Sequence, residues 1–408
     1  MSRNLETLVP VAAQQDAALY RLHDPQRETP LERFVVTSAS TRALINQPEY
    51  VGSRFRNALM KGVRQGLEML PFADEYRAIT DDERFNVVHF LRGGLNFGLM
   101  GGLAEAFGCN SHRASFMTSE RARDEEGRWF IREDQYMKLD VLPGSLLFAG
   151  DIVATGVTVA AGFAKIAEQV SGLPKDQLPP EIREFLFESI GEKAQADKTR
   201  PPKPATPLQE IVFVALGGHK IEKCLEVIHH FFKEQFPGYK RTTILYIEGK
   251  FHLADSKTPV HIKLQGTDLL RDPAVVAPEF FLSQYSSTSA PLERCIIYDG
   301  GSRSYHVRKH LHEVREYWEE VLTLATEEGW TLEQALKERW PETPFEEGFE
   351  AVQSWARERW PEIPDHQLET LWEAWGQRWT PMFRVFANNS KALERLCHRQ
   401  IQKFTVPE

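Results

Sequence analysis

The stretch LLFAGDIVATGVT, residues 146–158, decides how this chain should fold. Its apolar start continues into Gly150 and Asp151, which a small, hydroxyl-rich turn and then helical spacing follow. A strand, a tight loop and a helix start in this order form an anion site, because the first backbone N–H groups of the helix are unpaired and carry partial positive charge. Thr155 and Thr158 can donate hydrogen bonds to phosphate oxygens, and Asp151 can accept them from sugar hydroxyls. The stretch therefore predicts a site for a phosphorylated sugar.

The residues around this stretch alternate between short apolar runs and helical patterns. Runs rich in β-branched and aromatic residues predict strands at 86–91, 145–149, 210–216 and 242–247. Helices are expected after Val157, ending at Gly172, and after Gly218. This alternation predicts an α/β fold with a parallel or mixed sheet flanked by helices.

Three regions are expected along the chain. Residues 1–70 are interpreted as a helical or extended segment, 71–305 as the α/β domain, and 306–408 as a helical, tryptophan-rich region. Prolines gather at 173–208, which predicts an insertion or linker within the α/β domain. In the last region, aromatic residues spaced by three and four favour a helical core or a protein interface over a surface that stacks bases.

The composition is that of a soluble protein without a targeting segment. The formal net charge of -9 argues against a general attraction to nucleic acid or to an anionic membrane, so small anions are the expected charged ligands. No run approaches the roughly 20 apolar residues that cross a bilayer. The four cysteines are far apart and form no CxxC pair, which indicates neither a zinc site nor a disulfide framework. We therefore expect a cytoplasmic protein.

A second loop with phosphate-binding character lies upstream. The strand ending near residue 91 continues into RGGLNFG, residues 92–98. Arg92 suits a diphosphate, because its planar guanidinium can donate two parallel hydrogen bonds. A strand-to-helix turn without a ligand would explain the glycines but not this arginine. Between the two loops, the charged segment 120–127 separates two apolar runs and predicts a hairpin with a mobile tip.

The order of these features resembles the type I phosphoribosyltransferases, and most closely their uracil phosphoribosyltransferase-like members. The resemblance covers roughly residues 85–305, and it implies a Rossmann-like sheet of the phosphoribosyltransferase type with an α-helical C-terminal region added. It also implies Mg²⁺-dependent transfer of a phosphoribosyl group from phosphoribosyl pyrophosphate to a nucleobase-like nitrogen, with release of diphosphate. A homodimer is implied, and neither a membrane nor a nucleic acid is an expected partner.

The resemblance assigns roles to individual residues. Arg92, Asp151 and Arg121 of the flap would be catalytic, with Arg123 as the alternative to Arg121, and Asp151 would also contact the metal. The donor-binding residues would be Gly93, Gly94, Gly150, Asp151, Ala154, Thr155, Gly156, Val157 and Thr158. A weaker match is DGGSR, residues 299–303, which resembles a segment near the base pocket of the family but is also a common turn.

The chain departs from the family pattern at two positions. Gly150 stands where the first of two acidic residues is expected, and Val157 stands where the loop usually has glycine or serine. Gly150 removes one ribose contact, which affects catalysis more than binding. Two other hypotheses therefore stay open. The chain could be a regulator or scaffold that keeps the pocket as a sensor and binds a partner through its helical C-terminal region, or another doubly wound enzyme in which the motifs are coincidental.

Overall fold

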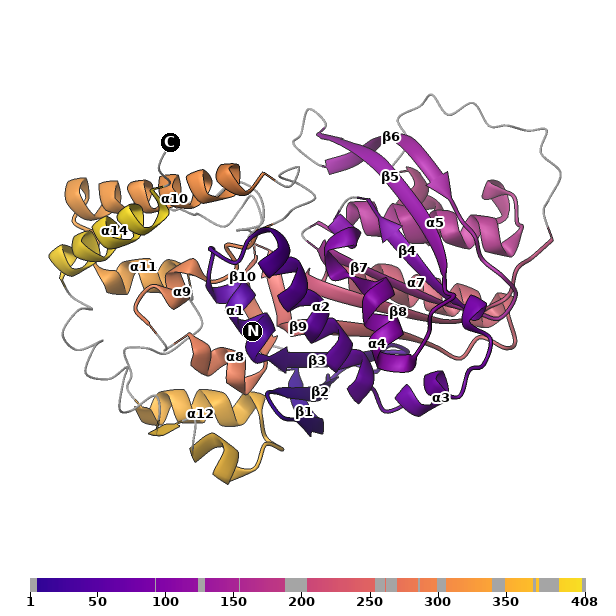
Figure 1. The fold of residues 1–408 in the computed structure, drawn as a ribbon, viewed down its shortest axis with the longest axis horizontal. Coiled ribbons are helices and arrows are strands. Elements are labelled where there is room, and N and C mark those ends of the chain that lie inside the picture. The colour runs from indigo at the N-terminus through magenta and orange to yellow at the C-terminus, as the bar shows by residue number, and fades with distance from the viewer. Residues whose placement is uncertain are drawn as a thin grey trace. The chain divides into compact units, whose positions relative to one another are not determined.

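The protein, in a computed structural model, is an α/β structure built on a ten-stranded mixed sheet flanked by helices (Figure 1), which confirms the expected class. The residues described are 6–91, 93–123, 129–153, 155–187, 204–253, 261, 270–284, 287–298, 306–339, 349–369, 372–373 and 389–405. In sheet order the strands are β1 (Thr7–Gln14), β2 (Ala17–His23), β3 (Glu32–Ser38), β9 (Arg241–Leu253), β8 (Leu208–Gly218), β7 (Ser145–Val153), β4 (Phe85–Phe90), β5 (Arg113–Arg123) and β6 (Trp129–Lys138), with β10 (Leu270–Val276) paired to β9.

The chain divides into two compact units that are each discontinuous in sequence. The first comprises Met1–Gln26, Val35–Gly62 and Glu248–Glu408, and the second comprises Arg27–Phe34 and Val63–Ile247. This division differs from the three consecutive ranges expected from the sequence. The difference arises because β3 and β9 each pass from one unit into the other. Residues before 70 also contribute strands as well as helices.

The second unit contains the parallel core. Strand β4 pairs in parallel with β5 on one side and with β7 on the other, and β7 also pairs in parallel with β8. The carboxyl ends of β4, β7 and β8 therefore lie at the same edge of the sheet. Strand β5 continues into an antiparallel pairing with β6, as the predicted hairpin requires. Of the charged segment 120–127 expected at its tip, residues 120–123 belong to β5 and residues 124–127 lie outside the described residues.

Helices cover both faces of this core. Phe163 of α5 packs on Phe90 of β4, and α6 and α7 lie beside α5. Phe85 and Phe90 lie five residues apart on β4, so their side chains point to opposite faces of the sheet. On the face of Phe85, the ring of Tyr76 from α3 packs against it. The helices of this unit are α3 (Ala73–Arg77), η1 (Asp82–Arg84), η2 (Gly93–Phe97), α4 (Leu99–Phe107), α5 (Val157–Ser171), η3 (Lys175–Gln177), α6 (Pro180–Phe187) and α7 (Lys220–Gln235), while α2 (Gly52–Met69) continues into it from the first unit.

The first unit is mostly helical after β10. Its helices are α1 (Ala39–Asn46), α8 (Pro278–Ser283), α9 (Ala290–Glu293), α10 (Val307–Glu327), α11 (Leu332–Arg339), α12 (Phe349–Arg359) and α14 (Ser390–Phe404), and α10 and α14 lie side by side (Figure 1). Trp318 and Trp360 are fully buried, and Trp355 stacks on Phe281 with ring centroids 4.7 Å apart. These three tryptophans form core, as the aromatic spacing predicted, and do not offer their faces to bases.

A buried carboxyl group ties β9 to the start of α1 within the first unit. The hydroxyl of Thr37 donates to Glu248 Oε2 at 2.6 Å, and the backbone N–H of Ser38 donates to Oε1 at 2.9 Å. The Thr41 hydroxyl also contacts Oε1. Ser38 is the N-cap of α1, so Glu248 joins the capping network of this helix. Burial raises the pKa of the Glu248 carboxyl from its ordinary 4.5 to about 7.

This raised pKa predicts a pH dependence of stability. Because the folded value exceeds the unfolded one, the contribution of Glu248 to stability is fully present below pH 4.5 and is lost as the pH rises through about 7. We expect a loss of about 2 kcal/mol from this residue between about pH 5 and pH 8, measured by urea unfolding. Glu248→Gln should remove it. Burial also raises the pKa of Glu293 to about 7, so a residual slope should remain. Identical slopes for the wild type and Glu248→Gln would contradict this assignment.

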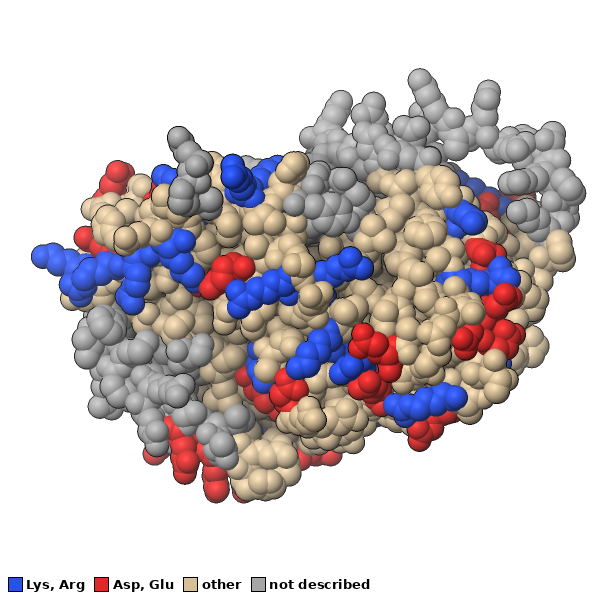
Figure 2. Space-filling model, viewed as in Figure 1, with Lys and Arg blue, Asp and Glu red and all other residues tan. Residues whose placement is uncertain are grey.

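Lys and Arg are interspersed with Asp and Glu on the face shown in Figure 2. All four cysteines are buried, and none of them forms a disulfide. In the described part of the chain, no helix is both long and apolar enough to cross a membrane.

Candidate functional site

The two loops that the sequence singled out lie against each other at the carboxyl edge of the second unit's sheet. A Cβ placed on Gly93 would lie 2.5 Å from Asp151 Oδ1, and one placed on Gly94 would lie 3.0 Å from the carbonyl oxygen of Gly150. The two loops are more than 50 residues apart in sequence, and they meet because β4 and β7 are parallel neighbours. A side chain at Gly94 would press on the backbone of the neighbouring loop, whereas one at Gly93 would meet the movable end of the Asp151 side chain.

Gly150 lies beneath an aromatic ring that sequence reasoning did not anticipate. A Cβ on this residue would lie 2.9 Å from two ring carbons of Phe97, which is buried at the end of η2. An acidic side chain therefore has no room at position 150. Phe97 occupies the space that an acidic side chain at position 150 would need.

Asp151 is the acidic side chain at this edge. It is half-buried near the end of β7, and its Oδ1 accepts a hydrogen bond from the backbone N–H of Ile152 at 2.9 Å. The carboxylate faces Gly93 of the upstream loop. Asp151 thus lies between the two loops, where it can accept hydrogen bonds from hydroxyl groups of a bound sugar.

The start of α5 forms the other side of the site. Gly156 is the N-cap residue, with a left-handed φ of 75°, and no side chain caps the first turn. Thr155, Val157 and Thr158 are half-buried. An uncapped helix start beside two hydroxyl side chains suits a phosphate group, because the backbone N–H groups of the first turn point away from the helix.

A third loop, which follows β8, completes this edge. Gly217 pairs with Val153 of β7 at a φ of 131°, a conformation that favours glycine. The next residues lead into Lys220, the first residue of α7. A Cβ placed on Gly156 would lie 3.7 Å from Lys220 Cβ. The sequence signal was present, since β8 ends in two glycines and Lys220 follows shortly after, but only the parallel pairing shows that they adjoin the loop at Gly156.

A buried histidine supports the upstream loop. His89 lies next to the end of β4, its ring stacks on Phe116 with centroids 5.1 Å apart, and Gly94 lies over its backbone. Burial lowers the pKa of His89 from its ordinary 6.5, so the ring is neutral near neutral pH and adds no charge to the site.

Several predicted site residues are not placed. Arg92, Ala154 and the segment 299–303 lie outside the described residues. Arg121 and Arg123 belong to β5, where the backbone of Arg121 pairs with Ile131, but their side chains are not described. The roles of these residues stay predictions.

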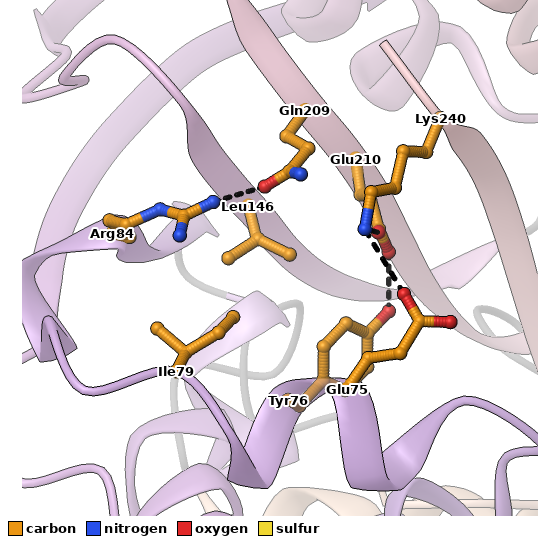
Figure 3. Close-up of a pocket in the computed structure, with 8 residues that line it drawn as sticks. All are labelled: Glu75, Tyr76, Ile79, Arg84, Leu146, Gln209, Glu210 and Lys240. Carbon is orange, nitrogen blue, oxygen red and sulfur yellow. Dashed lines mark hydrogen bonds and ion pairs between the residues drawn. The ribbon is translucent and has the colours of Figure 1, made fainter. Parts of the chain in front are cut away.

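A small pocket of about 80 Å³ lies at the opposite, amino-terminal edge of the sheet (Figure 3). It is lined by Glu75, Tyr76, Ile79, Arg84, Leu146, Gln209, Glu210 and Lys240. The Tyr76 hydroxyl donates to Glu210 at 2.8 Å, Arg241 donates to both oxygens of Glu210 at 2.9 and 3.0 Å, and Lys240 pairs with Glu75 at 3.1 Å. These polar groups satisfy one another, so we interpret the pocket as a structural ion-pair network.

The buried carboxylate of this network, Glu210, is predicted to contribute to the stability of the protein but not to ligand binding. Glu210→Gln should destabilise the protein by about 2 kcal/mol, because Arg241 loses the charge of its doubly hydrogen-bonded partner and keeps Glu75 as its charged partner. Urea unfolding measures this loss, with Glu234→Gln on exposed α7 surface as the neutral control. Affinity for a phosphorylated sugar should not change. A large loss of that affinity in Glu210→Gln would place the ligand at this edge instead.

Comparison of the chain with protein-family models and with curated proteins found no match. The function is therefore inferred from the carboxyl-edge site itself, where three loops from neighbouring parallel strands meet around Asp151 and the start of α5. Ligands of open α/β sheets bind outside the carboxyl ends of the strands, which is the edge that these loops form.

Proposed function

We propose that this protein is a phosphoribosyltransferase that transfers a phosphoribosyl group from phosphoribosyl pyrophosphate to a nucleobase-like nitrogen and releases diphosphate. One observation carries the proposal. The two loops that resemble the pyrophosphate loop and the phosphate loop of the type I family are in contact, through Gly93 with Asp151 and through Gly94 with Gly150. The contact lets both loops reach a single bound ligand.

The proposed site residues would divide the donor among them. Asp151 would accept hydrogen bonds from the ribose hydroxyls, and the first turn of α5 with Thr155 and Thr158 would hold the 5′-phosphate. Arg92 and the backbone of Gly93 and Gly94 would hold the diphosphate. Departure of diphosphate leaves positive charge on the ribose, so the residues that stabilise the leaving group lower the barrier most.

The proposal includes Mg²⁺. This ion usually takes one or two carboxylates and completes its octahedral shell with substrate phosphates and water, so the single half-buried carboxylate of Asp151 fits such a role. Bound with the donor, Mg²⁺ would offset the negative charge that develops on the diphosphate.

The β5–β6 hairpin would act as the flap over the donor. Strand β5 lies next to β4, whose end carries the upstream loop, so the hairpin begins at the correct edge. Closure would exclude water, which could otherwise capture the ribose cation and hydrolyse the donor. Arg121 or Arg123 would approach the diphosphate from the flap. We further propose that the protein is a cytoplasmic homodimer and that its ligands are the donor and a nucleobase-like acceptor.

The test is diphosphate release from phosphoribosyl pyrophosphate and Mg²⁺ across a panel of purine and pyrimidine bases. Release that depends on one base would support the proposal and identify the acceptor. No release with any base, together with measurable binding of the donor, would contradict the enzymatic function.

That second outcome is the one expected of a different function. Phe97 occupies the space of a first acidic residue at Gly150, which removes a ribose contact and favours binding without turnover. In this alternative the protein is a sensor of phosphoribosyl pyrophosphate or a nucleotide, and its helical C-terminal region, residues 306–408, binds a partner. Donor binding without turnover would support it, and base-dependent release would exclude it.

A further inference from the structure

Lys220, the first residue of α7, lies beside Gly156 in the proposed phosphate loop. A Cβ placed on Gly156 would lie 3.7 Å from the Cβ of Lys220 and 3.9 Å from the backbone nitrogen of Ile221. Since β7 and β8 are parallel neighbours, α5 and α7 both start at the carboxyl edge of the sheet. The amino-terminal ends of two helices and one lysine therefore meet at the same place.

This arrangement gathers positive charge at the start of α7. A lysine in the first turn of a helix opposes the helix dipole, whose amino-terminal end is positive. The N-cap residues of α5 and α7, Gly156 and His219, make no side-chain capping hydrogen bond. The acidic residue of the first turn of α7, Glu222, is buried against Arg33 and Tyr246. Across the described ranges no carboxylate forms an ion pair with the exposed Lys220. A bound anion would remove this unfavourable interaction.

We propose that Lys220 binds the 5′-phosphate of the donor, together with the first turn of α5 and the Thr155 hydroxyl. This inference rests on the proposed function and adds to it a residue that the sequence resemblance does not assign. The sheet order distinguishes the 5′-phosphate from the diphosphate. Strand β8, which leads to Lys220, and strand β4, which leads to Gly93, lie on opposite sides of β7. The lysine thus adjoins the α5 side of the site and not the upstream loop. Its long stem lets the ammonium reach an oxygen there.

The experiment measures affinity for two partial ligands, ribose 5-phosphate and diphosphate with Mg²⁺, by isothermal titration of the full chain. Lys220→Ala should weaken the binding of ribose 5-phosphate about 10- to 100-fold, because charge-assisted hydrogen bonds to its phosphate are lost. The affinity for diphosphate should change by less than about 3-fold, because the removed charge acts on this ligand only at long range, where salt screens it. Lys220→Arg should keep most of the affinity. The matched control is Lys223→Ala, an exposed lysine on the same helix.

The possible results separate this inference from the proposed function. Wild-type affinity of Lys220→Ala for ribose 5-phosphate would overturn the assignment of Lys220 while leaving the proposed function intact. An equal loss for both ligands would also overturn it, because it would show general attraction and not contact with one phosphate. Wild-type protein that binds neither ligand and no phosphoribosyl pyrophosphate would contradict the proposed function and the lysine assignment together.

Discussion

Asp151→Asn should weaken binding of phosphoribosyl pyrophosphate with Mg²⁺ about 100-fold and abolish measurable turnover. The carboxylate is proposed to accept hydrogen bonds from two ribose hydroxyls and to contact the metal, and each hydrogen bond to a charged group contributes about 1.5–3 kcal/mol. Asparagine has the same size and can still accept the hydrogen bond from the Ile152 N–H. The fold should therefore persist, so that the loss reports on the ligand.

Asp176→Asn is the matched control for this substitution. Asp176 is an exposed carboxylate in η3 of the same unit, and its loss should leave donor affinity and stability unchanged. Donor affinity is measured by isothermal titration, and stability by thermal unfolding. Retained affinity in Asp151→Asn, especially in combination with Thr155→Ala, would favour the hypothesis that the motifs are coincidental and that the protein is another doubly wound enzyme.

Gly217→Ala should have the largest effect on stability, a loss of about 4 kcal/mol. At its φ of 131° an L-residue is strained, and its Cβ would overlap the carbonyl oxygen of Val153 and lie 3.1 Å from the carbonyl carbon. Both atoms belong to the backbone of the neighbouring strand, so they cannot move without separating β7 from β8. Donor binding should also fail, because the start of α5 follows directly from β7.

Two other glycines of the same unit separate the causes of this loss. Gly108→Ala introduces a left-handed residue at a φ of 72° but no close contact, and should cost about 1 kcal/mol. Gly238→Ala introduces neither and should stay within about 0.5 kcal/mol of the wild type. The readout is the free energy of unfolding in urea. A Gly217→Ala variant no less stable than Gly108→Ala would contradict the close approach of β7 and β8.

Much of the second unit could be predicted from sequence because its signals are local. Strand β7 and helix α5 follow from an apolar run, a glycine turn and apolar spacing that ends at Gly172, which caps the helix with a left-handed φ of 68°. The same kind of pattern predicted β4, β8 and α7. By contrast, strands β1 to β3 were interpreted only as a helical or extended segment, because their pairing partners decide their structure and pairing is not visible locally.

The site divides in the same way. The positions of Asp151, Thr155, Gly93 and Gly94 after apolar strands predicted their place in the site. The structure brings Gly93 and Gly94 against Gly150 and Asp151. Phe97 and Lys220 were missed, because their roles depend on which loops adjoin across the sheet. The sequence shows a phenylalanine three residues after Gly94 and a lysine after a glycine pair. Only parallel pairing places one over Gly150 and the other beside Gly156.

The central claim is that a phosphorylated sugar binds where β7 turns into α5. Isothermal titration of the wild-type protein with phosphoribosyl pyrophosphate in the presence of Mg²⁺ tests it most directly. We predict saturable binding with one donor per chain, weakened by Asp151→Asn and unaffected by Glu210→Gln, which alters the opposite edge of the sheet. Heat no greater than that of dilution would contradict the account.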